Sequence, residues 1–300
     1  MTTIGLIGLG IMGSPMARNW LQAGFAVQGF DFNPKRLEEL AAAGGTPAGN
    51  ATEAIRGADI VAMMVPDSPD VLNVLTAPGG VFETAPAGTL VIDFSTIRPD
   101  VAADAARQAR EHGLRFLDAP VSGGEAGAIA GSLSIMVGGS DEDFAAAAQV
   151  FAAVGKTIVH VGPNGAGQTV KAANQLIVAA NMQALAEAVL FLEAFGVDME
   201  AAIAVLKGGL AGSAVMEQKA TKMVTREFAP GFKVNLHHKD MGIVTAAARE
   251  AGVVIPVGAL MAQLMASARA NGDGDQDHSA LLRGVERLSG PASVKPGKAA

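Results

Sequence analysis

The sequence predicts an α/β protein of two domains, in which a doubly wound, mostly parallel sheet is followed by an all-α C-terminal domain. Short apolar strands alternate with helical patterns up to about residue 163, which is typical of a parallel sheet covered on both faces. Beyond that point, apolar residues recur only at helical spacing. We therefore expect domains over 1–163 and 164–290, a long linking helix over 165–195, and a disordered tail over 291–300.

Composition excludes several classes of function. The chain has 300 residues, half of them hydrophobic, and its net charge of −7 argues against nucleic acid or an anionic membrane surface as a partner. It contains no cysteine, which excludes thiolate chemistry, and its five histidines show no metal-ligand spacing. We expect a cytoplasmic protein without a metal, a signal peptide or a membrane span.

The first strand, Thr3 to Ile7, runs into a glycine-rich turn that opens a helix, and a second strand ends at Asp31. This order matches the dinucleotide-binding fingerprint of a Rossmann-type domain. In that fingerprint the turn and helix N-terminus bind a pyrophosphate, and the acidic residue accepts hydrogen bonds from a ribose. A glycine-rich turn with no ligand is the alternative. The predicted cofactor-binding residues are Gly8, Leu9, Gly10, Ile11, Met12, Gly13 and Asp31.

The charge of Asp31 also bears on which dinucleotide is bound. A carboxylate at this position should repel a 2′-phosphate, and Phe32 offers no guanidinium, so we expect NAD(H) to be preferred. Lys35 and Arg36 lie close enough in sequence to reach a 2′-phosphate, which leaves NADP(H) possible.

Further strands are predicted at 59–65, 90–92, 115–117, 133–137 and 157–161, with helices at 34–43, after Pro69, at 99–112 and at 141–153. Ligands of such a sheet bind beyond the carboxyl ends of its strands. Polar turns there begin at Val65-Pro66, Ser95-Thr96 and Asp118. Within the last of these turns, Ser122, Gly123 and Gly124 could turn their N–H groups inward as an anion nest suited to a carboxylate. An ordinary glycine loop is the alternative.

The stretch from Gly165 to Gly196 reads as one long helix that is apolar nearly all round. Lys171 interrupts it about one turn in, and Asn174 and Gln175 follow on the same face. A cation near a helix N-terminus opposes the helix dipole, so its position is more easily explained by use than by stability. In the alternative, Lys171 extends to solvent and the two amides only satisfy backbone groups.

The remaining residues predict helices at 198–206, 213–226, 234–251, 256–271 and 279–288. Polar residues gather at 235–240, where His237, His238 and Lys239 stand in an otherwise apolar region. Taken alone, this cluster is most simply interpreted as the charged surface of a helix.

Four motifs in this order resemble the β-hydroxyacid dehydrogenases over residues 2 to about 289. They are the glycine-rich turn at 8–13 with Pro15-Met16, the turn at 118–124, Gly165-Ala166-Gly167 followed by Lys171 and Asn174, and Lys239-Asp240. Residues 171–175 and 208–213 look most like the branch that reduces tartronate semialdehyde. The 3-hydroxyisobutyrate branch more often has a second Asn at the position of Gln175.

The resemblance implies a two-domain, usually dimeric or tetrameric enzyme that assembles through its helical domain and acts on a small substrate with a carboxylate. It implies Lys171 as the catalytic acid or base, and Ser122, Gly123, Gly124, Asn174 and Gln175 as substrate-binding residues. Val65, Pro66, Asp70, Thr96 and Lys239 would line the cofactor.

The chemistry is consistent with these roles, because hydride transfer to an aldehyde leaves an alkoxide that a positioned ammonium can stabilise and protonate. We expect reduction of tartronate semialdehyde to D-glycerate, with 3-hydroxyisobutyrate or another short 3-hydroxy acid as the alternative substrate. A non-catalytic cofactor-binding scaffold and an imine reductase are rivals from other classes, and the presence of Lys171 argues against both.

Overall fold

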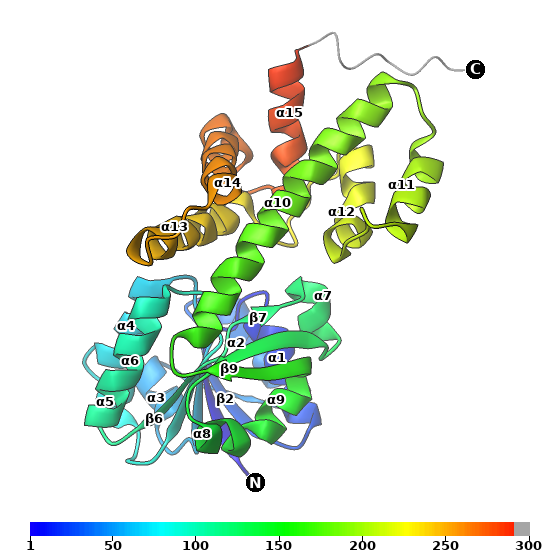
Figure 1. Cartoon of the computed structure of the whole chain (residues 1–300). Coiled ribbons are helices and arrows are strands. Elements are labelled where there is room, and N and C mark those ends of the chain that lie inside the picture. Colours follow the sequence, from blue (N-terminus) through cyan, green and yellow to red (C-terminus); the bar gives the residue numbers. More distant parts are fainter. Residues whose placement is uncertain (291–300) are drawn as a thin grey trace. The chain divides into compact units, whose positions relative to one another are not determined.

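The computed structural model describes residues 1–290 and divides the chain into two compact units (Figure 1). The first unit covers Met1–Lys171, and the second begins at Ala172. The boundary falls inside helix α10 (Ala166–Ala194). The first unit is a doubly wound α/β sheet and the second is helical, so the predicted fold class is confirmed. The expected tail at 291–300 lies outside the described residues.

The sheet of the first unit has nine strands in the order β3-β2-β1-β4-β5-β6-β8-β7, with β9 paired to β8. Only the pairs β6·β8 and β7·β8 are antiparallel. The strand order reverses between β1 and β4, which is where a doubly wound sheet binds its ligand. The strands are β1 (Thr3–Ile7), β2 (Ala26–Phe30), β3 (Thr46–Pro47), β4 (Ile60–Met63), β5 (Leu90–Asp93), β6 (Arg115–Asp118), β7 (Val121–Ser122), β8 (Leu133–Gly138) and β9 (Gly155–Gly162).

Two hydrophobic cores lie on opposite faces of this sheet. Successive side chains of a strand point to opposite faces, so Leu6 of β1 packs with Trp20 in one core and Ile7 packs with Val71 in the other. The covering helices are α1 (Gly13–Gln22), α2 (Pro34–Ala42), α3 (Ala51–Ile55), α4 (Ser68–Thr76), α5 (Val81–Thr84), α6 (Pro99–Glu111), α7 (Gly124–Ile129), α8 (Asp141–Ala146) and α9 (Ala148–Val154).

The sequence did not predict the shortest elements of this unit. Strands β3 and β7 have two residues each, and helices α3, α5 and α7 have four to six, which is too few for a hydrophobic period to show. The helix expected over 141–153 is two helices, α8 and α9, that meet at Ala147.

The helical unit contains the rest of α10, then α11 (Met199–Gly208), α12 (Ala214–Thr225), α13 (Val234–Glu250), α14 (Pro256–Ala268), η1 (Arg269–Asp273), η2 (His278–Ala280) and α15 (Leu281–Ser289). Met182, Val189 and Met265 are among the fully buried residues of its core. The helix expected to reach residue 271 is regular only to Ala268, because the chain turns at Gly272, where φ is 86°.

Helix α10 is long and apolar enough to cross a membrane when judged by length and composition alone. Its residues Ala179, Met182, Leu185 and Ala186 are, however, buried in the core of the helical unit. This burial is typical of the core helix of a soluble protein.

Candidate active site

The glycine-rich turn has the geometry of a phosphate-binding loop. A Cβ atom on Gly8 would lie 2.3 Å from the carbonyl oxygen of Met64, and one on Gly13 would lie 2.0 Å from that of Gly8, so only glycine fits at either position. A Cβ atom on Gly10 would have no atom within 4 Å. The backbone at Gly10 therefore borders open space in front of the N-terminus of α1, which is the positive end of the helix dipole. This arrangement fits a dinucleotide pyrophosphate.

Asp31 is held in place at the end of β2. One carboxylate oxygen, Oδ2, accepts a hydrogen bond from the backbone N–H of Leu9 over 2.8 Å, and Oδ1 accepts one from Asn33 over 2.8 Å. The carboxylate thus faces the glycine-rich turn, as binding of a ribose beside a pyrophosphate requires. The neighbouring Phe32 is 91% exposed.

The other predicted cofactor residues of the first unit lie at the ends of β4 and β5. The backbone N–H of Val65 donates to Oγ of Ser95 over 3.0 Å, which brings the Val65-Pro66 turn next to the turn that holds Thr96. Asp70 is exposed and belongs to the capping box of α4, where its carboxylate accepts from the N–H of Asp67 over 3.1 Å. Capping of α4 is therefore a sufficient structural reason for an aspartate at position 70, independent of any cofactor.

Lys171 is 7% exposed, and its Nζ atom donates a hydrogen bond to the carbonyl oxygen of Val121 over 2.7 Å. The alternative in which this lysine extends to solvent is therefore wrong. Val121 precedes Ser122 in β7, so the ammonium is attached to the strand that carries the predicted substrate residues.

The segment 122–124 is not a simple loop. Ser122 ends β7, Gly123 is the N-cap of α7, and Gly124 is the first residue of that helix. Both glycines have positive φ, 136° and 64°, a backbone region that other residues rarely adopt. The requirement for glycine therefore has a backbone cause, whatever ligand the segment binds.

Asp118, at the end of β6, is a site residue that sequence reasoning did not single out. Its buried carboxylate accepts hydrogen bonds from the backbone N–H groups of Gly165 over 2.8 Å and Gln168 over 3.1 Å, at the start of α10. Burial raises the pKa of Asp118 to about 6, while these N–H groups oppose the rise, so the carboxylate is ionised at neutral pH. The sequence signals were its position at the end of a strand and its place as the first residue of the motif at 118–124.

Further along α10, in the helical unit, the predicted residues form a chain of polar contacts. Asn174 Nδ2 donates to Gln175 Oε1 over 2.8 Å, and Gln175 Nε2 donates to the carboxylate of Asp240. The other oxygen of Asp240 lies 2.8 Å from Nζ of Lys239. The structure thus connects Asn174 to Lys239 through Gln175 and Asp240, so the two amides do not serve backbone groups alone.

The interpretation of residues 235–240 as a charged helix surface is wrong. His237 is fully buried and Asp240 is 3% exposed. Nε2 of His237 lies 3.2 Å from the carbonyl oxygen of Gln175 and must donate to it, and its Nδ1 shares a 3.0 Å hydrogen bond with Nδ1 of His278, in which the protonation of the two rings sets the donor. His278 in turn neighbours the buried ion pair of Lys219 with Asp277.

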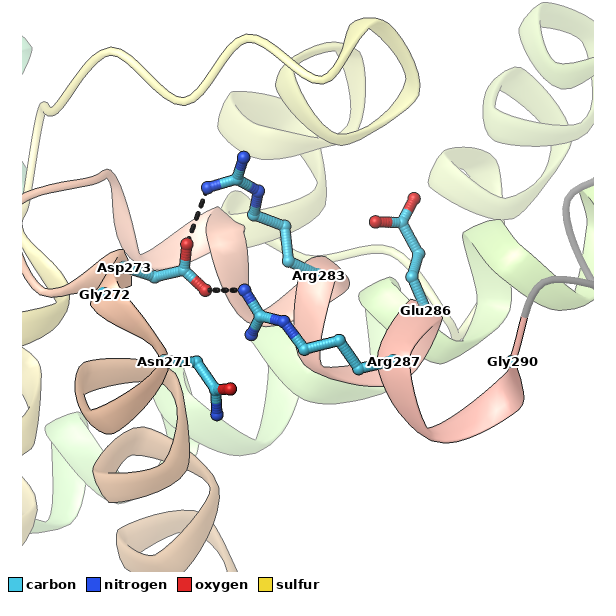
Figure 2. Close-up of a pocket in the computed structure, with 7 residues that line it drawn as sticks. All are labelled: Asn271, Gly272, Asp273, Arg283, Glu286, Arg287 and Gly290. Atoms are coloured by element: carbon cyan, nitrogen blue, oxygen red, sulfur yellow. Dashed lines mark hydrogen bonds and ion pairs between the residues drawn. The ribbon is translucent and has the colours of Figure 1, made fainter.

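A surface pocket of about 600 Å³ in the helical unit contains none of the predicted site residues (Figure 2). In it, Arg283 and Arg287 each donate over 2.6 Å to the buried carboxylate of Asp273. These bonds hold α15 against the turn after α14, which makes the arginines structural. Within residues 1–290, no group of three or more His, Asp or Glu side chains is placed to hold a metal ion.

Comparison with known proteins agrees with this geometry. Residues 3–162 match the family model described as the NAD binding domain of 6-phosphogluconate dehydrogenase. Residues 165–285 match the one described as the NAD-binding domain of NADP-dependent 3-hydroxyisobutyrate dehydrogenase. Together the two models cover nearly the whole described chain.

Individual relatives match over nearly their full length. The chain is 41% identical to 2-hydroxy-3-oxopropionate reductase of Escherichia coli (strain K12), over 95% of this chain and 98% of the relative. It is 38% identical to 2-(hydroxymethyl)glutarate dehydrogenase of Eubacterium barkeri, over 98% of each. The solved structure of Mycobacterium tuberculosis 3-hydroxyisobutyrate dehydrogenase with L-serine superposes with a TM-score of 0.86 and 34% identity, over 95% of this chain and 99% of that chain. The chain therefore belongs to the β-hydroxyacid dehydrogenases, the NAD(P)-dependent oxidoreductases of small hydroxy acids.

Proposed function

We propose that this enzyme reduces tartronate semialdehyde to D-glycerate with NADH, and that Lys171 is the general acid. The observation that carries the proposal is the buried ammonium of Lys171, 2.7 Å from the carbonyl oxygen of the residue that precedes Ser122. The similarity to the reductase of Escherichia coli supports the choice of substrate.

The cofactor supplies the hydride when it is bound. The glycine-rich turn at 8–13 would hold its pyrophosphate, and Asp31 would accept hydrogen bonds from the adenosine ribose. Val65, Pro66 and Thr96 would line the nicotinamide half, and Lys239 would add a positive charge. The negative charge of Asp31 favours NAD(H), and NADP(H) remains a possible cofactor.

On the substrate side, Ser122 and the N–H groups of Gly123 and Gly124 would bind the carboxylate. Asn174 would bind the hydroxyl group on the neighbouring carbon. Gln175 accepts a hydrogen bond from the side-chain N–H₂ of Asn174, so the oxygen of that amide would be the group that accepts from the hydroxyl.

Lys171 completes the reaction. As the aldehyde carbon gains a hydride, its oxygen becomes an alkoxide, which the ammonium stabilises by charge and then protonates to the alcohol. In the reverse direction the neutral amine accepts the proton from the alcohol. The carbonyl of Val121 holds the side chain without competing for its proton, because an amide oxygen is a very weak base.

Short 3-hydroxy acids are the alternative substrates, since 3-hydroxyisobutyrate and L-serine carry the same carboxylate and β-carbon oxygen. A panel of tartronate semialdehyde, D-glycerate, 3-hydroxyisobutyrate and L-serine, each with both nicotinamide cofactors, tests the proposal. We expect the highest kcat/KM for tartronate semialdehyde with NADH. A tenfold higher value for another member would assign the enzyme to that substrate, and turnover of none would support a non-catalytic scaffold.

We further propose that the enzyme is a cytoplasmic homodimer or homotetramer assembled through its helical unit. Helix α14 contains no charged residue, yet Val257 and Leu260 on it are 52% and 55% exposed, and Ile177 and Phe191 of α10 are 57% and 63% exposed. Light scattering coupled to gel filtration should give two or four times the mass of 30.3 kDa. A wild-type monomer at micromolar concentration would contradict this assembly.

A further inference from the structure

The side chain of Gln168 makes two hydrogen bonds that the proposed mechanism does not use. It is 1% exposed in the first turn of α10, where Oε1 accepts from the N–H of Ile97 over 3.0 Å and Nε2 donates to the carbonyl oxygen of Ser95 over 2.7 Å. One amide thus binds the backbone on both sides of Thr96. A buried amide with both ends paired holds two segments at a fixed separation, because any shift leaves polar groups unsatisfied.

The backbone around Gln168 is fixed as firmly as its side chain. The carboxylate of Asp118 accepts from the N–H groups of Gly165 and Gln168, which caps the start of the helix. A Cβ atom on Gly167 would lie 2.4 Å from the carbonyl oxygen of Met136, so the first turn rests directly on the end of the sheet. The helix start therefore has little freedom to slide or rotate.

Gln168 and Lys171 are three residues apart on α10 and share a face of the helix. We propose that Gln168 is a positioning residue that holds the proton donor Lys171 in register with the turn at Thr96, which lines the cofactor. Asp118 assists by fixing the helix start. This inference rests on the proposed function, since it assumes that Lys171 donates the proton and that Thr96 faces the cofactor.

A double-mutant cycle separates positioning from simple structural support. Gln168→Met keeps the length of the side chain and removes both hydrogen bonds. We expect kcat for reduction to fall about 10- to 100-fold, because a displacement of about 1 Å can have that effect. The Kd of NADH, measured by fluorescence, should change less than threefold. In a Lys171→Ala background with methylamine as the free proton donor, Gln168→Met should change the rate less than threefold, since a free amine needs no anchor.

Accessibility of the amine gives a readout that does not depend on turnover. In protein without added cofactor, Gln168→Met should raise the rate at which an amine reagent labels Lys171, followed by peptide mass spectrometry, at least about fivefold. Labelling of Lys219, which is 8% exposed and paired with Asp277, should not change. Gln183→Met is the matched control for kcat, because Gln183 is also a buried glutamine of α10 but donates only to Glu187 over 2.9 Å.

Three outcomes would overturn the positioning role: an unchanged kcat in Gln168→Met, an equal loss in both lysine backgrounds, or unchanged labelling of Lys171. If Gln168→Met does not fold, Gln168→Glu takes its place, since it keeps the acceptor for Ile97 and loses the donor to Ser95. The proposed function fails in a different way, namely if Lys171→Ala alone keeps wild-type turnover, whatever residue stands at position 168.

Discussion

The ammonium of Lys171 and the carbonyl oxygen of Val121 are joined by a 2.7 Å hydrogen bond between α10 and β7. These residues are 50 positions apart in the chain, and the bond places a buried cation next to the strand that ends at Ser122. A buried ammonium loses most of its hydration, which costs free energy unless its partners replace that hydration. A role in proton transfer would explain its presence, and the following variants test that role.

Replacement of Lys171 by Met keeps most of the apolar stem and removes the charge and the proton. We expect kcat to fall at least roughly a thousandfold, because general acid catalysis contributes about 10²–10⁴-fold and loss of charge stabilisation adds to it. The melting temperature should hold or rise, and NADH should still bind. Steady-state kinetics measures kcat, calorimetry measures the melting temperature, and fluorescence titration measures the binding of NADH.

Lys219→Met is the matched control, since Lys219 is also a buried lysine but pairs with Asp277 over 2.8 Å. Here the melting temperature should fall, because the buried carboxylate of Asp277 loses its ion-pair partner and keeps only hydrogen bonds to neutral groups, while kcat should stay within about threefold. A folded Lys171→Met variant that kept more than about a tenth of wild-type turnover would end the catalytic assignment.

Asp31→Asn should weaken the preference for NADH. The amide can still accept from the N–H of Leu9 but no longer repels a 2′-phosphate, so kcat/KM with NADPH should rise while that with NADH falls. Asp59→Asn is the control, because that carboxylate also accepts a backbone hydrogen bond, from Thr3 over 2.8 Å, but at the amino end of the strands. If kcat/KM of the wild-type enzyme with NADPH equals or exceeds that with NADH, the predicted preference for NADH is refuted.

Gly123→Val should block the substrate and spare the adenine site. A side chain there is strained at a φ of 136°, and its Cβ atom would lie 3.2 Å from Leu133, so the N–H groups of the segment would shift. We expect KM for the semialdehyde to rise at least about tenfold, with the Kd of NADH within twofold. Gly88→Val is the control, because Gly88 has a φ of 85° and a Cβ atom there would have no other atom within 4 Å. This variant therefore measures the cost of backbone strain without a steric contact. Equal losses for substrate and cofactor would make the segment structural.

Stability should depend on pH through His278. Burial, followed by the nearby His237 and Lys219, holds the pKa of His278 well below its usual value of 6.5. The unfolded chain therefore takes up this proton first as pH falls, so the contribution of His278 to stability is present above about pH 6.5 and is lost below it.

His278→Asn offers both a donor and an acceptor to Nδ1 of His237 but cannot titrate. It should be less stable than wild type at pH 7.5, and the gap in melting temperature should narrow as pH falls to about 5.5. A gap that is constant across this range would show that His278 does not titrate between the two states.

The sequence predicted the parts of this protein that carry long periodic patterns or special backbone requirements. Strand β1 begins and ends where the pattern indicated, and α10 covers the stretch expected over 165–195 apart from one residue at each end. Gly8 and Gly13 were identified from spacing, and their close contacts with backbone oxygens explain why that spacing is informative.

Contacts between distant residues could not be read in the same way. Asp118 meets the start of α10 across 47 and 50 positions, and Gln175 meets Asp240 across 65. No local pattern records which buried carboxylate will meet which N–H group, because the fold makes that pairing. The polar residues at 235–240 were misinterpreted for the same reason, since local sequence indicates polarity but not burial.

Helix α10 crosses the boundary between the two compact units at Lys171 and Ala172 without a break. In most multidomain proteins the boundary between domains is an exposed linker, where proteases cleave and where domains can be exchanged. Here a cleavage would fall in the middle of a helix and would leave up to four N–H and four C=O groups without their hydrogen-bond partners. Limited proteolysis should therefore spare this boundary. Chimeras that exchange specificity between relatives should carry the helix whole, so that Lys171, the proposed proton donor, and Asn174 and Gln175, the proposed substrate-binding residues, are inherited together.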